Sequence, residues 1–125
     1  MKNFEFNKQK KVTQRTIKIS GISFTFNPLS YNTNKAIQKY INVNDNLIKK
    51  MNKATEVKEK SDLIMKSCNQ ARQTMNAILG AGAYEKVFGD RDIDFFENQE
   101  VMGYIFEQIT KFAEEMKENY EHPAN

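Results

Sequence analysis

This chain of 125 residues has no tryptophan, one cysteine, one histidine and two prolines. The single cysteine, Cys68, excludes an intrachain disulfide framework and is typical of a reducing cytoplasm. The single histidine, His122, sits in a polar C-terminal stretch and provides neither a metal-ligand set nor a catalytic base. No apolar run is long enough for a signal peptide or a membrane span. We therefore expect one soluble, cytoplasmic domain with no cofactor, no metal ion and no membrane partner.

Two segments approach ligand-binding motifs without completing them. Acids alternate in 90–94 as in a calcium loop, but Phe95 stands where that loop needs glycine and Val101 where it needs a bidentate glutamate. Gly80 and Gly82 lack the lysine and hydroxyl residue of a phosphate loop. No nucleophile has an obvious neighbouring base. These failures favour a binding protein over an enzyme.

The N-terminal part has a period of two. Between Val12 and Asn27, apolar residues alternate with polar ones on both sides of Gly21, a pattern that predicts a β-hairpin. Pro28 stops the second strand because proline has no amide hydrogen for the ladder. A two-stranded hairpin is marginal alone, so we expect its apolar face to pack on the helices that follow.

Helical periodicity follows to near the end of the chain. It predicts helices over residues 33–54 and 57–79, and a final helix capped by Asn98 that runs to about residue 120. The glycines on both sides of residues 83–88 predict a short helix there. No Pro or Gly compels a break near residue 55, so 33–79 forms either one long helix or two. The first predicted helix presents an apolar face made by Ile37, Tyr40, Ile41, Leu47, Ile48 and Met51, and the second begins its face at Val57.

The predicted fold is therefore mainly α (α+β), an N-terminal β-hairpin followed by a bundle of three to four helices. We expect residues 1–11 to be a flexible basic arm, 12–120 to be a single domain, and 121–125 to be a polar tail.

The final helix carries the strongest apolar stripe. We expect it either to pack on the chain's own core, the favoured interpretation, or to bind a partner. With two residues of the preceding helix, the candidate set is Met102, Ile105, Ile109, Phe112, Met116, Met75 and Ile78. Gly103 lies inside this helix, where glycine lowers stability, so we expect another element to approach it closely.

The net charge of +3 conceals a strong polarity. Residues 1–20 carry six bases and one acid, 21–89 carry ten bases and five acids, and 90–125 carry three bases and ten acids. Such asymmetry predicts that the acidic end meets the basic remainder, within one molecule or between copies. The candidate charges are Lys10, Lys11, Arg15, Glu114 and Glu115. The basic residues near the N-terminus could bind phosphates. They include only one arginine and no repeated aromatic residues, so the pattern is weaker evidence for nucleic-acid binding.

The order of elements resembles a known family, and one segment carries most of the resemblance. It has the form Ile78-Leu79-Gly80-x-Gly82-Ala83-x-x-x-Val87-Phe88-Gly89, then Arg91-x-Ile93-Asp94 and a helix opening with Glu100-Val101. Over residues 15 to 118 or so, the chain resembles the tail assembly chaperones of long-tailed (siphovirus-type) phages and prophages of Gram-positive bacteria.

The resemblance implies a small, helical, oligomerising protein that binds the hydrophobic tape measure protein and keeps it soluble while tail tube subunits assemble. It implies the host cytoplasm as location, absence from the mature virion, and the tape measure protein, the tail tube protein and further copies of the chain as partners. Two other interpretations stay open: a small nucleic-acid-binding regulator that uses the basic arm, and a structural virion subunit.

Overall fold

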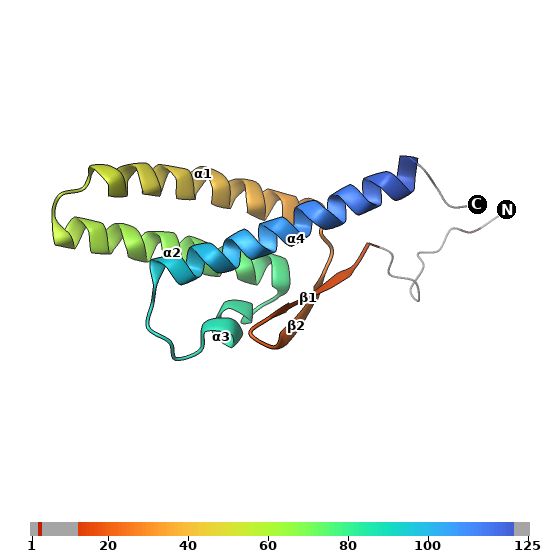
Figure 1. The fold of residues 1–125 in the computed structure, drawn as a ribbon, viewed down its shortest axis with the longest axis horizontal. Helices are drawn as coiled ribbons and strands as arrows, with labels where there is room; N and C mark the ends of the chain where they lie inside the picture. Colours follow the sequence, from red (N-terminus) through yellow and green to blue (C-terminus); the bar gives the residue numbers. More distant parts are fainter. Residues whose placement is uncertain (1–2, 4–12, 122–125) are drawn as a thin grey trace.

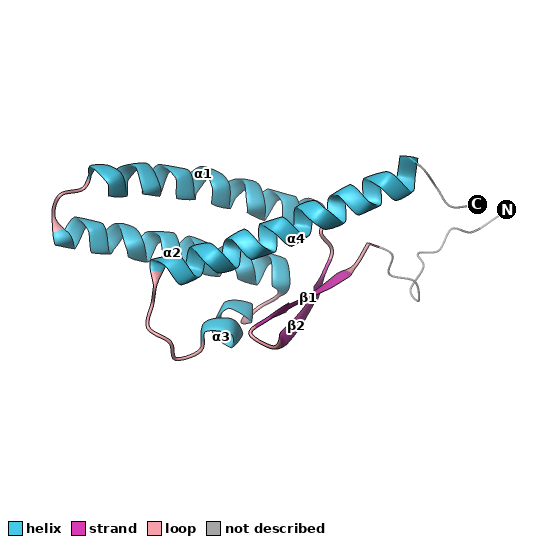
Figure 2. Cartoon of the chain, viewed as in Figure 1, coloured by secondary structure: helices cyan, strands magenta, loops and turns pink. Residues whose placement is uncertain are grey.

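A computed structural model describes residue 3 and residues 13–121, which form a β-hairpin followed by four helices (Figures 1 and 2). The elements are β1 (Arg15–Ile19), β2 (Ile22–Phe26), α1 (Tyr31–Lys53), α2 (Val57–Leu79), α3 (Ala83–Phe88) and α4 (Phe95–Glu121). The predicted mainly helical α+β fold with an N-terminal hairpin is confirmed. Apart from Asn3 and Glu121, the predicted arm (1–11) and tail (121–125) lie outside the described residues.

The hairpin is antiparallel and pairs Ile19 with Ile22 across a two-residue turn. Ser20 and Gly21 both have positive φ, 52° and 79°, as the favoured hairpin turns with right-handed twist require. The inward side chains are buried and the outward ones exposed, as period-two alternation predicts. The buried set is Ile17, Ile19, Phe24 and Phe26.

α1 and α2 form an antiparallel pair, so the segment that allowed one helix or two contains two (Figure 1). α1 starts after Ser30, whose side chain accepts a hydrogen bond from the Thr33 amide at 3.1 Å. α1 ends at Lys53; the next residue, Ala54, is extended and lies in a small apolar cluster with Leu47 and Leu63. That cluster holds the tip of the helical pair together, away from the main core.

The apolar faces predicted for these two helices are partly wrong. Ile41 is 45% exposed and Val57 is 80% exposed, so neither packs on the core with the rest of its predicted apolar face. Val57 is the first residue of α2, beyond the tip cluster. Ile41 lines an open groove that it shares with residues of α4.

The start of α4 also differs from the prediction. Asn98 does not cap the helix, which begins three residues earlier at Phe95. Asp94 provides the cap, because its Oδ1 accepts from the Glu97 amide at 3.0 Å. Asn98 is instead a buried residue of the first turns, and its Nδ2 donates to the Asp94 carbonyl at 2.8 Å.

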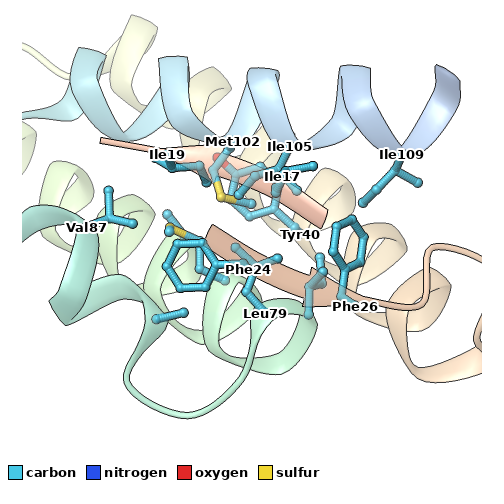
Figure 3. Close-up of a cluster of buried hydrophobic side chains, with 14 of the residues drawn as sticks. Ile17, Ile19, Phe24, Phe26, Tyr40, Leu79, Val87, Met102, Ile105 and Ile109 are labelled. Atoms are coloured by element: carbon cyan, nitrogen blue, oxygen red, sulfur yellow. The ribbon is translucent and has the colours of Figure 1, made fainter. Parts of the chain in front are cut away.

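The main core lies where α4 crosses the hairpin and α2 (Figure 3). Met102 and Ile105 of α4 are almost fully buried, as are Ala71 and Met75 of α2. α3 closes one side of the core with Val87 and Phe88. The C-terminal turns of α4 extend past the start of α1 (Figure 1). One cluster therefore unites both strands and all four described helices.

Gly103 contradicts the prediction of a close approach. It is exposed, and a Cβ built at this position meets no atom within 4 Å.

We expect Gly103→Ala to raise the free energy of unfolding by roughly 0.5–1 kcal/mol, because alanine loses less backbone entropy in a helix. Gly82→Ala is the matched control, since Gly82 has φ +80° and alanine there should lower stability. The urea midpoints of both variants should be compared with that of the wild type. A Gly103→Ala variant less stable than the wild type would contradict the open space seen around Gly103.

Candidate interaction surface

The structure places most of the predicted stripe inside the chain's own core. Met102, Ile105 and Ile109 are buried on α4, and Met75 and Ile78 are buried on α2. Phe112 and Met116, farther along α4, are only partly buried. Five members of the stripe are therefore covered by this chain itself, and its C-terminal end is left at the edge of the core.

A groove opens between α1 and α4 at this edge, with a volume of ≈ 410 Å³. We call it the α1/α4 groove. Its apolar lining comes from Ile37 and Ile41 of α1 and from Phe106, Ile109 and Ala113 of α4. The polar residues along it are Asn34, Thr110, Glu114 and Lys117. The mostly apolar walls with a polar rim are typical of a surface that binds an apolar partner.

The floor of the α1/α4 groove is firmly positioned. The ring of Phe106 packs edge-on against Tyr40 of α1, with 5.4 Å between ring centroids. Ile109 is 6% exposed and belongs to the main core. The groove therefore has a well-packed base, and Ile41 on its wall is half-exposed.

The candidate charges divide into three groups. Arg15 packs on α4: its guanidinium lies 5.5 Å from the Phe112 ring centroid, and Nη2 donates to Met116 Sδ at 3.3 Å. Glu114 and Glu115 are exposed on α4. Lys10 and Lys11 lie outside the described residues. Arg15 thus contacts α4 through a ring and a sulfur atom, whereas association driven by opposite charges stays a prediction.

A buried polar cluster joins α1, α2 and α4 beside the groove. Asn44 of α1 accepts from Ser67 Oγ of α2 at 2.7 Å and donates from Nδ2 to Gln99 Oε1 of α4 at 3.2 Å. Gln99 Nε2 in turn donates to the Tyr40 hydroxyl at 3.2 Å. Among the described residues, no buried side-chain nitrogen or oxygen lacks a hydrogen-bond partner. These bonds form together only at one register of the three helices.

A second set of polar contacts fixes α3 against α4. The Tyr84 hydroxyl donates to Asn98 Oδ1 at 2.8 Å, and the Tyr84 amide donates to Asn76 Oδ1 of α2 at 2.9 Å. Burial raises the pKa of the Tyr84 hydroxyl, so the donor form is retained. Asn98, predicted as a helix cap, instead links α4 to α3 through its hydrogen bond with Tyr84.

The single cysteine does not form a reactive centre. Cys68 is buried on α2, and burial raises the pKa of its thiol, which disfavours the nucleophilic thiolate. The described part of the chain brings together no group of three or more His, Cys, Asp or Glu side chains suited to a metal ion. None of the described helices is long and apolar enough to cross a bilayer.

Sequence reasoning missed both the groove and the polar clusters. A signal for the clusters was present, because Tyr40, Asn44 and Leu47 recur at helical spacing on one face. A polar residue inside such a stripe needs a buried partner. The groove had no such signal, because it depends on where α4 crosses α1.

The chain was compared with protein families, with curated proteins and with solved structures. A family model matches residues 20–125, from the hairpin turn to the end of the chain, and its description is that of a family of unknown function, DUF6673. The comparisons with curated proteins and with solved structures returned no match.

The buried Tyr40 hydroxyl makes stability sensitive to alkaline pH. Desolvation raises the pKa of Tyr40 from 10.0 to about 12, with the Gln99 hydrogen bond opposing it. The folded state favours the protonated phenol. The raised pKa therefore contributes fully to the free energy of unfolding below pH 10, and this contribution is lost as pH rises toward 12. Between pH 9 and pH 11, the free energy of unfolding measured by urea titration should therefore fall by about 1 kcal/mol less in Tyr40→Phe than in the wild type. Tyr31→Phe, which removes an exposed hydroxyl, should keep the wild-type fall; an identical fall in all three proteins would refute the assignment.

Proposed function

This chain belongs to the DUF6673 family, and we propose that it is a tail assembly chaperone that binds and solubilises a phage tape measure protein. The proposed activity is binding without catalysis. Its place is the host cytoplasm during tail assembly, and the finished virion does not contain it. The tail tube protein is a further proposed partner, because it assembles around the same client.

The observation that carries the proposal is the α1/α4 groove. Ile37 and Ile41 stand one helical turn apart on α1. Phe106, Ile109 and Ala113 lie at i, i+3 and i+7 on the facing helix. Helix-binding grooves commonly take apolar anchors with this same spacing. The groove thus suits the apolar face of a helix, the element that a long helical client offers repeatedly.

The chemistry of the walls suits a client of variable sequence. The aliphatic and aromatic walls contribute apolar area without demanding a particular hydrogen-bond pattern. Glu114 and Lys117 on the rim provide one charge of each sign beside a bound helix. A solubilising protein needs such permissive contacts, because the helices along a tape measure protein differ in sequence.

Co-expression with the tape measure protein of the same genome tests the proposal. The client should move from pellet to supernatant when this chain is present. Ile41→Lys should abolish most of that rescue, because it places a charge on the apolar wall of the groove. Since Ile41 is already 45% exposed, the substitution should change the free energy of unfolding by less than about 1 kcal/mol.

Met65→Lys is the matched control. Met65 is 44% exposed in a helix interior, and it does not line the α1/α4 groove. It receives the same charge at the same exposure, so it should rescue the client as the wild type does. Equal loss of rescue in both variants, or a client that is soluble alone, would overturn the proposal. Co-purification with DNA in place of the client would favour the regulator interpretation.

A further inference from the structure

The turn before α4 and its first residues form an exposed acidic and apolar surface, which we call the Phe96 patch. Phe96 is 73% exposed and Ile93 is 53% exposed, although such side chains are usually buried. Asp90, Asp92 and Glu100 are exposed close to them in the chain. The Phe96 ring stands edge-on to Phe95, with 5.5 Å between centroids. Arg91 of the same segment pairs with Glu97, and no ion pair among the described residues involves Asp90, Asp92 or Glu100, so the segment is acidic overall. A large apolar side chain in an acidic segment is therefore presented to solvent.

A second groove has the opposite charge. It lies between α1 and α2, has a volume of ≈ 400 Å³, and is lined by no residue of α4 or of the hairpin. Ala36, Thr74 and Ala77 contribute small side chains to it, and the charged groups among its lining residues are Lys35 and Lys39. Both lysines are exposed, and Lys35 Nζ lies 5.9 Å from the Tyr31 ring centroid. Asn32, Gln70 and Gln73 also line it. This is the α1/α2 groove, in which two alanines lie among polar side chains and the charged edge is basic.

We propose that the Phe96 patch of one copy docks into the α1/α2 groove of a second copy. In this contact the Phe96 ring packs on Ala36 and Ala77, and Lys35 and Lys39 face the acids that flank the ring. The two surfaces are complementary in hydrophobicity and in charge, and complementary charge selects partner and orientation. The occupant is thus a second copy of this chain.

The two surfaces are different parts of the molecule, so the contact is head to tail. Each copy that uses its patch still has a free groove, and the next copy extends the assembly unless a ring closes. Two side chains and their surroundings bury less area than a standard stable interface. Association should therefore depend on concentration and weaken as salt screens the exposed charges, over a Debye length of about 8 Å at physiological ionic strength.

The first test is the mass in solution of the full chain and two variants. Analytical ultracentrifugation of the wild type should show a mass that grows with concentration and falls with salt. Phe96→Ser removes the apolar anchor, and the double substitution Lys35→Glu/Lys39→Glu reverses the charge of the groove. Each variant alone should be monomeric at concentrations where the wild type associates.

Two controls share the chemistry of these changes. Val57→Ser removes another exposed apolar side chain from the first turn of a helix, and Lys49→Glu/Lys50→Glu reverses two exposed charges elsewhere on α1. Both should associate as the wild type does.

Mixing the two monomeric variants gives the decisive result. The Phe96→Ser chain retains an intact groove, and the Lys35→Glu/Lys39→Glu chain retains an intact patch. Together they should form a 1:1 dimer and nothing larger. The intact patch of the lysine variant can dock into the intact groove of the Phe96→Ser chain, whereas the altered patch and the altered groove that remain cannot bind a further copy. Recovery of the dimer also shows that both variants are folded.

Three results would overturn the proposal: a wild type that stays monomeric at every concentration and salt, variants that associate like the wild type, or a mixture that remains monomeric. Client rescue depends on the α1/α4 groove and not on these residues. The self-docking proposal and the chaperone proposal can therefore fail independently.

Discussion

The crossing of α4 over the hairpin and the α1/α2 pair is the constraint on which the rest of the structure depends. A two-stranded hairpin cannot bury its apolar face alone, and the α1/α2 pair has an apolar face of its own to cover. One helix serves both: Met102 and Ile105 are buried in the core that the hairpin and α2 share. Beyond Ile109 the cover is incomplete, because the last turns of α4 extend past α1 (Figure 1). The α1/α4 groove is the direct result of this geometry.

Hydrogen bonding fixes where that crossing occurs. Apolar packing alone tolerates small shifts of one helix along another, but Asn44, Ser67 and Gln99 are satisfied only when three helices align. A shift of α4 by one turn would separate these groups and leave them buried without partners, which costs more than the bonds contribute when formed. The polar cluster therefore gives the groove beside it a defined shape, which a binding surface needs.

The sequence was sufficient to predict the strands and helices, but not to predict where α4 crosses the other elements. Alternation around Gly21 identified the hairpin, periodicity located the three long helices, and flanking glycines located α3, because all these signals are local. The start of α4 was misplaced, since Asp94 and Asn98 are equally good caps by residue type and only the contact with Tyr84 separates them. Gly103 and Ile41 were misjudged for the same reason: exposure on a helix flank depends on which neighbour lies there. The apolar stripe identified the core, whereas the groove and the Phe96 patch emerged only from the packing.

These features divide the proposed work among separate surfaces: the α1/α4 groove for a helical client, and the α1/α2 groove with the Phe96 patch for assembly of copies. The most direct test of the central claim is isoleucine methyl NMR of this chain, titrated with a soluble helical segment of the tape measure protein. The δ1-methyl signals of Ile37, Ile41 and Ile109 should shift together on binding, while Ile93, outside the groove, and Ile78, in the core, should stay in place. Shifts confined to Ile93, or a titration that moves no signal of the groove, would contradict the account.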